Sequence, residues 1–263
     1  MMSSERSTIT VPKLVAMKGA GEKITMLTAY DFPTAQLVDE ADIDVILVGD
    51  SLGTVVQGRP NTLSVTLDEM VYHTEMVSRA ASRALVVADM PFPTSPAGMC
   101  KAVEDAAVLL KKTQCHAVKV EGGKDRVELI RAIVSAGIPV MGHIGLLPQR
   151  VHQLGGYAVQ RDREQLLADA KAVEEAGAFS VVLECVPADH AREVTEAISI
   201  PTIGIGAGPD CDGQVLVFHD LLGMTSGYVP RHVKVYAELG RAIGQAVGQY
   251  CKDVRSGEFP GKR

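Results

Sequence analysis

The feature that most restricts the fold of this chain is an alternation. Short apolar runs rich in Val, Ile and Leu alternate eight times with longer segments of helical periodicity. The runs show little alternation with polar residues, which is typical of strands covered on both faces of a parallel sheet. The expected strands are 24–29, 45–49, 84–88, 117–120, 138–141, 179–183, 200–203 and a weaker one near 221–225. This repeat predicts an α/β fold, a (β/α)8 barrel, with a doubly wound open sheet as the alternative.

Capping residues mark several of the expected helices. Thr66 and Glu69 have the spacing of a capping box at the start of a helix. Ser95 followed by Pro96 has the form of an N-cap with proline at the first helical position. The last helix is expected over 232–251.

The length of the chain fits one barrel. It has 263 residues, and α/β barrels often run to about 250 residues as one unit. We expect a single domain over 1–263, with a flexible tail over 1–10 and an extra helix over 11–19 that closes the barrel's bottom. The segment 144–161 is long for a loop in a compact domain and contains a Gly-Gly pair. It is expected to be a lid, with a plain surface insertion as the alternative.

Composition and charge exclude several classes of protein. The chain is 46% hydrophobic and 22% charged, which excludes a disordered chain. A net charge of −6 without a long basic run argues against nucleic acid and anionic membranes as partners. No apolar stretch approaches the roughly 18 residues that a membrane span needs.

The cysteines and the N-terminal residues indicate the cellular compartment. Five cysteines without a C-x-x-C pair fit a reducing compartment. The segment 1–10 is polar and lacks the apolar region of a signal peptide. Arg6 and the neighbouring Ser and Thr residues leave a mitochondrial address open, against which Glu5 and the short length argue. We therefore expect a cytoplasmic protein.

Ionisable residues follow the expected strands. Asp50, Asp89, Glu121 and Glu184 each come directly after an apolar run, and His143 follows the fifth run. The C-terminal ends of parallel barrel strands meet at one mouth, so we expect these side chains in one pocket. Carboxylates packed together repel one another, and a divalent cation such as Mg²⁺ resolves the repulsion with oxygen ligands. The alternative is that each acid caps a helix or pairs with a surface base.

Two further residues fit an anionic substrate at that mouth. Lys119 lies two positions before Glu121, so both side chains point to the same face of a strand. A buried ammonium there would bind an anion, whereas on the outside it would form an ordinary salt bridge. Ser51 could bind a substrate carboxylate or cap a helix. His143 is expected to be a hydrogen-bonding residue beside the metal rather than a ligand.

Nine stretches of the chain, five of which contain these residues, carry a family resemblance. They are LTAYD (27–31), LVGDS (47–51), ADMPF (88–92), VKVEGG (118–123), GHIGL (142–146), LGGY (154–157), LECVP (183–187), IGIGAG (203–208) and SGEFP (256–260). Their order and spacing over nearly the whole chain resemble the ketopantoate hydroxymethyltransferase family.

The resemblance implies a (β/α)8 barrel of the phosphoenolpyruvate/pyruvate type and a homo-oligomer, typically a decamer. It implies transfer of a hydroxymethyl group from 5,10-methylenetetrahydrofolate to 3-methyl-2-oxobutanoate, giving 2-dehydropantoate in pantothenate biosynthesis. The reaction would pass through an enolate stabilised by Mg²⁺ or a similar divalent ion.

The resemblance also implies roles for individual residues. Asp50 and Asp89 resemble ligands of both metal and substrate, with Glu121 also on the metal, while Ser51 and Lys119 resemble substrate-binding residues. Glu184 resembles the catalytic proton acceptor. It ends the sixth expected strand, across the mouth from the other three acids. His143 is the second candidate for the base.

Two other functions stay open from the sequence. One is another metal-dependent lyase or mutase of 2-oxo acids from the same group of barrels, which would share the metal chemistry. The other is a non-catalytic protein that binds an oxo acid, in which Glu184 would take no part.

Overall fold

The computed structural model describes residues 7–93, 98–225 and 227–261. The expected N-cap at Ser95 and Pro96 lies outside the described residues, as do residues 1–6 of the expected tail. Within the described ranges, no helix has the length and apolar character to cross a membrane. The chain divides between Val215 and Leu216 into two compact units. A single domain over 1–263 therefore stays a prediction.

Eight parallel strands close into a barrel in chain order. They are β1 (Ile24–Thr28), β2 (Val45–Val48), β3 (Leu85–Asp89), β4 (Ala117–Glu121), β5 (Val140–Gly145), β6 (Ser180–Glu184), β7 (Thr202–Ile205) and β8 (Gly213–Leu216). Every residue of β2, β3 and β4 is buried, which explains why these strands are apolar apart from Lys119 in β4 and the acids that end β3 and β4. The closed barrel confirms the expected fold and excludes the open sheet.

The eighth strand was expected in the wrong place. Leu221 ends a short helix, α10 (Phe218–Leu221), residues 222–225 follow that helix, and the strand is Gly213–Leu216. This strand begins with a glycine, and a Cβ on Gly213 would lie 2.5 Å from the carbonyl oxygen of Ile24 in β1. Close backbone approach and the exposed Gln214 leave it without an apolar run, so its sequence lacks the usual signal.

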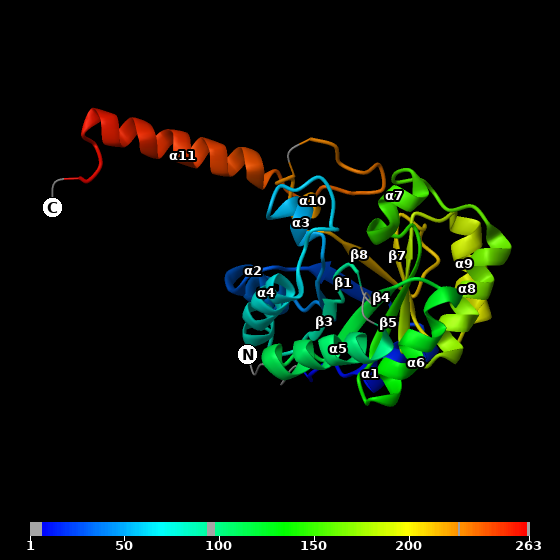
Figure 1. Cartoon of the computed structure of the whole chain (residues 1–263). Coiled ribbons are helices and arrows are strands. Elements are labelled where there is room, and N and C mark those ends of the chain that lie inside the picture. The colour runs from blue at the N-terminus through cyan, green and yellow to red at the C-terminus, as the bar shows by residue number, and fades with distance from the viewer. Residues whose placement is uncertain (1–6, 94–97, 226, 262–263) are drawn as a thin grey trace. The chain divides into compact units, whose positions relative to one another are not determined.

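Helices surround the strands, as Figure 1 shows for α4, α5, α6, α8 and α9. The helices of this part of the chain include α2 (Phe32–Glu40), α3 (Leu52–Val55), α4 (Leu67–Ala80), α5 (Met99–Thr113), α6 (Val127–Ser135), α7 (Val151–Leu154), α8 (Arg163–Glu175) and α9 (Ala188–Ala197). The capping box of Thr66 and Glu69 is confirmed at the start of α4.

The last helix, α11 (Leu239–Ser256), begins and ends later than expected. The preceding segment is held in a non-helical path by backbone hydrogen bonds from Tyr236 to Leu221 and from Leu239 to Leu222. The start of the helix was predicted from local periodicity, which carries no information on hydrogen bonds between residues so far apart in the sequence.

The extra N-terminal helix is confirmed as α1 (Val11–Ala20). Leu14 and Met17 of this helix belong to one buried cluster with Ile24, Val45 and Leu85, residues at or near the first positions of their strands. The helix therefore covers the end of the barrel opposite the C-terminal ends of the strands, and it seals the interior away from the expected site.

Leu14→Ala should lower the free energy of unfolding by about 2–5 kcal/mol, because Leu14 is fully buried and its removal leaves a cavity. The same substitution at Leu37, whose side chain is 64% exposed on α2, should change stability by no more than about 0.5 kcal/mol. Chemical denaturation of both variants measures the difference. Equal effects would contradict a packed seal at the bottom of the barrel.

Candidate active site

The residues expected at the barrel mouth lie together at the C-terminal ends of the strands. Asp89, Glu121 and Glu184 are the last residues of β3, β4 and β6, and Asp50 follows β2. His143 lies within β5, which extends further than expected. Apart from Glu184, these side chains are buried, and none of the four acids is the N-cap of the helix that follows it, so the alternative of separate helix caps is wrong.

Lys119 lies inside this cluster and not on the outer surface. Its Nζ is 3.0 Å from Oδ1 of Asp89 and 3.9 Å from Oε1 of Glu121. Oδ2 of Asp89 accepts a hydrogen bond of 3.0 Å from the backbone N–H of Asp50. One buried ammonium therefore faces carboxylates from two neighbouring strands, with a third carboxylate close by.

His143 connects this cluster to Glu184. Its Nδ1 lies 3.0 Å from Nζ of Lys119 and 3.6 Å from Oε1 of Glu121. Its Nε2 lies 3.1 Å from Oε2 of Glu184. The Glu184 side chain is 19% exposed, against 4% for Glu121. Glu184 is therefore the carboxylate of the group that faces the opening.

Burial and neighbouring charges raise the pKa of two of the buried acids and lower the pKa of the third. Burial, with the charges of Asp89 and Glu121, raises the pKa of Asp50 well above its usual range. Burial also raises the pKa of Asp89, although the Lys119 charge opposes this shift. Contacts with His143 and Lys119 outweigh burial at Glu121 and lower its pKa. Without a further cation, Asp50 is the acid that most readily keeps a proton.

The two basic groups are shifted as well. Burial would lower the pKa of Lys119, but the charges of Asp89 and Glu121 outweigh it and raise this pKa. Burial and the Lys119 charge lower the pKa of His143, yet contacts with Glu121 and Glu184 raise it to about 9. Lys119 can donate to Nδ1 only while that nitrogen carries no proton, so the hydrogen bond from Lys119 and the positive charge on His143 exclude each other.

Gln149 belongs to the site and was not expected from the sequence. Its Nε2 donates to Oδ2 of Asp50 and to the carbonyl oxygen of Met90, both at 2.9 Å. Its backbone N–H donates to Oε2 of Glu121 at 3.0 Å. A single glutamine in a loop has no distinguishing pattern, and its only signal was its place in the segment 144–161.

Ser51 lies at the edge of the acid cluster. Its Oγ is 2.8 Å from the hydroxyl of Tyr30, a fully buried side chain whose pKa is raised by burial. A Cβ on Gly49 would lie 2.6 Å from this Oγ and 3.6 Å from Oδ2 of Asp89. Glycine at this position therefore lets Ser51 fold back toward the carboxylates.

The oxygen donors of the cluster suit a hard divalent cation. Among the residues that the structure describes, no three His, Cys, Asp or Glu side chains are arranged to hold a metal ion together. Glu121 is engaged by Lys119, His143 and Gln149. Mg²⁺ is usually bound through one or two carboxylates and keeps several waters. The two carboxylates of Asp50 and Asp89 fit this mode of Mg²⁺ binding.

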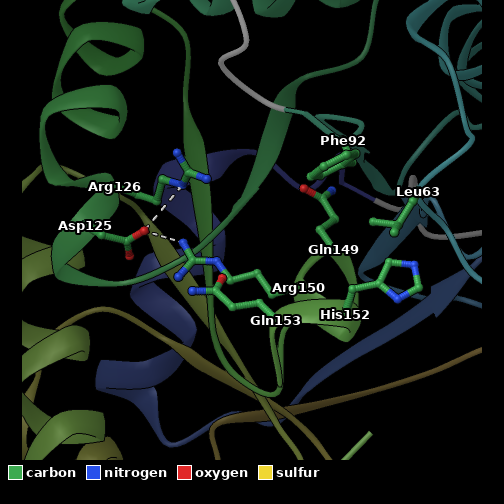
Figure 2. Close-up of a pocket in the computed structure, with 8 residues that line it drawn as sticks. All are labelled: Leu63, Phe92, Asp125, Arg126, Gln149, Arg150, His152 and Gln153. Atoms are coloured by element: carbon green, nitrogen blue, oxygen red, sulfur yellow. Dashed lines mark hydrogen bonds and ion pairs between the residues drawn. The ribbon is translucent and has the colours of Figure 1, made fainter. Parts of the chain in front are cut away.

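A pocket of about 400 Å³ adjoins the cluster. Figure 2 shows Leu63, Phe92 and His152 on one side of it and Asp125, Arg126 and Arg150 on the other. Gln149 also lines this pocket, so the residue that holds Asp50 and Glu121 forms part of its wall.

Comparisons with known proteins show the family of the chain. A sequence profile of ketopantoate hydroxymethyltransferase matches residues 8–262. The 3-methyl-2-oxobutanoate hydroxymethyltransferase of Rhodopirellula baltica is 56% identical, covering 99% of this chain and 97% of its own length. The enzyme of the same name from Moorella thermoacetica is 55% identical, covering 98% of this chain and 97% of its own.

Solved structures similar to this one share its barrel. A 2,3-dimethylmalate lyase of the PEP mutase/isocitrate lyase superfamily superposes with a TM-score of 0.64 at 20% identity, covering 96% of this chain and 90% of its own. A phosphonopyruvate hydrolase superposes with a TM-score of 0.64 at 13% identity, covering 94% and 88%. These likenesses show the fold, whereas the profile and the close relatives show the family. The chain therefore belongs to the ketopantoate hydroxymethyltransferase family.

Proposed function

We propose that this protein transfers a hydroxymethyl group from 5,10-methylenetetrahydrofolate to 3-methyl-2-oxobutanoate, giving 2-dehydropantoate for pantothenate biosynthesis. Relatives that carry the name of this activity match nearly the whole chain at 51–56% identity. The observation that carries the proposal is the buried chain of contacts from Asp89 through Lys119 and His143 to Glu184, which ends at the open side of the site.

The reaction needs a proton removed from C3 of the oxo acid. The C3–H bond breaks, and its electron pair forms a C–C bond to the one-carbon unit of the folate. The two C–N bonds to that carbon break and one water supplies the hydroxyl group, while the other hydrogen of the water and the proton from C3 end on the two nitrogens of the departing tetrahydrofolate. The proton at C3 is weakly acidic, so the site must both stabilise negative charge on the oxo acid and place a base.

We propose that Asp50 and Asp89 hold Mg²⁺ or a similar divalent ion, with Glu121 beside them. When bound, the ion would supply Lewis-acid polarisation of the substrate's 2-oxo group, which lowers the barrier by several kcal/mol. The raised pKa of Asp50 supports this role, because a cation relieves the repulsion that otherwise favours the protonated carboxyl. A solved barrel of similar fold, phosphonopyruvate hydrolase, is described as a complex with oxalate and Mg²⁺.

The chain's own side chains would perform the remaining steps. Lys119 and Ser51 bind the oxo acid, together with Asp50 and Asp89, and the Lys119 ammonium attracts its negative charge. Glu184 takes the C3 proton, since it is the exposed carboxylate of the group, and such a base contributes about 10²–10⁴-fold. His143 orients Glu184 through its Nε2 and is the second candidate for the base.

Mass spectrometry of the products tests the proposal against its alternatives. The purified protein with Mg²⁺, 3-methyl-2-oxobutanoate and 5,10-methylenetetrahydrofolate should form 2-dehydropantoate, and a chelator should stop the reaction. A lyase or mutase of the same barrel group would instead cleave or rearrange a 2-oxo acid without folate. A non-catalytic binding protein would bind the oxo acid and form no product.

A homo-oligomer, a decamer as in the family, is proposed as the working form. Apolar side chains at helical spacing are left exposed on α11, at Leu239, Ile243, Val247, Tyr250 and Val254. Light scattering of the purified protein gives the subunit number.

We also propose that the protein is located in the cytoplasm, because all five of its cysteines are free.

We also propose that the segment 144–161 closes over the site during the reaction. Limited proteolysis within this segment should slow when oxo acid and folate are both bound, because closure keeps water from the reacting carbon. Gln149 ties one end of the segment to Asp50 and Glu121, which supports a coupling between substrate and loop. Equal cleavage rates with and without ligands would leave the segment an ordinary connection.

A further inference from the structure

We propose that the pocket beside the acid cluster is the site of the folate substrate. Its pterin and aminobenzoyl rings would pack on the side of Phe92 and Leu63, and its glutamate carboxylates would bind Arg126 and Arg150. This inference rests on the proposed function, and it assigns the binding of the second substrate to residues that have no proposed part in the proton transfer or in metal binding.

The position of the pocket suits a substrate that must meet the oxo acid. Gln149 lines the pocket and also donates to Oδ2 of Asp50 at 2.9 Å. One side chain thus separates the pocket from the carboxylates proposed to hold metal and oxo acid. The volume of about 400 Å³ lies within the range of about 300–1,000 Å³ that is usual for sites of small molecules.

The apolar side of the pocket offers a ring to stack on. Phe92 is 43% exposed, although a large aromatic side chain is usually covered. It follows the strand-end residue Asp89 by three positions, so it lies close along the chain to the proposed metal site. Planar rings gain both apolar burial and favourable stacking geometry against such a side chain.

The charged side of the pocket has an excess of positive charge. Arg126 and Arg150 share one carboxylate, Asp125: Nη2 of Arg150 bonds to it directly, and Nε of Arg126 lies 3.7 Å away. Two guanidinium groups therefore face one carboxylate, and each remains partly exposed. Guanidinium groups bind carboxylates in a bidentate manner, which matches the glutamate end of a folate.

The two arginines are held directly over the end of β4. A Cβ on Gly122 would lie 2.4 Å from Cγ of Arg126 and 3.1 Å from Nη2 of Arg150. Gly122 follows Glu121, so the absence of a side chain there brings both arginines close to the acid cluster. The positive charge is thus placed beside the site and not on a distant surface.

Steady-state kinetics of Arg126→Gln and Arg150→Gln test the assignment. Each variant should raise the KM for 5,10-methylenetetrahydrofolate by about tenfold or more, because a charge-assisted bond to a carboxylate is lost. The KM for 3-methyl-2-oxobutanoate should stay at its wild-type value. Arg131→Gln is the matched control, since Arg131 pairs with Glu128 at 2.6 Å and does not line the pocket.

Exchange of the C3 proton of the oxo acid with D₂O distinguishes a failure of the folate-site assignment from a failure of the proposed function, because this exchange needs no folate. Both arginine variants should exchange the proton as the wild type does, which also shows that they are folded. An unchanged folate KM in both variants would overturn the assignment, and so would a loss of exchange or a raised oxo-acid KM. If the proposed function itself is wrong, the wild type will show neither exchange nor product.

Discussion

Glu184→Gln is expected to bind 3-methyl-2-oxobutanoate and Mg²⁺ as the wild type does, yet to lose turnover and C3 proton exchange together. The amide keeps the size of the side chain but cannot accept the proton. Of the carboxylates at the mouth, Glu184 alone is appreciably exposed to the opening, and its Oε2 lies 3.1 Å from Nε2 of His143. We expect a loss of about 10²–10⁴-fold, the usual contribution of a placed base.

Proton NMR in D₂O measures this exchange, because deuterium at C3 removes the splitting of the methyl signals. Glu164→Gln, on the exposed face of α8, is the matched control and should exchange at the wild-type rate. Wild-type exchange by Glu184→Gln would place the base elsewhere, and His143 would then be the next candidate.

Asp89→Asn should weaken Mg²⁺ binding and lower activity by orders of magnitude. The substitution removes a negative charge from the proposed metal pair while keeping an oxygen that can accept the N–H of Asp50. It also deprives Lys119 of its nearest carboxylate, at 3.0 Å, so binding of the oxo acid changes as well. Loss of this proposed metal ligand should therefore weaken binding of the cation and of the anionic substrate together.

Isothermal calorimetry gives the Mg²⁺ affinity of this variant, and circular dichroism shows whether the barrel is intact. Asp210→Asn, at an exposed position in a loop, removes the same charge away from the site and should leave the affinity unchanged. An intact Asp89→Asn barrel with wild-type Mg²⁺ affinity would contradict the metal assignment.

The barrel and the convergence of the acids could be predicted because both follow from local patterns. Continuous apolar runs mark buried parallel strands, and the topology of a closed barrel then brings Asp50, Asp89, Glu121 and Glu184 to one end. The position of β8 could not be predicted, because glycine is required at position 213 by the close approach of the β1 backbone, and a glycine adds nothing to an apolar run.

The finer structure of the site depends on contacts between residues distant in sequence. Gln149 joins Asp50 to Glu121 across three different segments, and no spacing along the chain indicates this arrangement. The link from Lys119 to Glu184 through His143 depends on side-chain positions in β4, β5 and β6. The pairing of Arg126 and Arg150 on Asp125 likewise appears only once the chain is folded.

Metal dependence of C3 proton exchange by the wild-type protein tests the central claim most directly. With 3-methyl-2-oxobutanoate alone in D₂O, the protein should exchange the C3 proton when Mg²⁺ is present. The exchange should stop with a chelator and return when excess Mg²⁺ is added. Exchange that persists unchanged after chelation, or that is absent with saturating Mg²⁺ and oxo acid, would contradict a metal-assisted base at this barrel mouth.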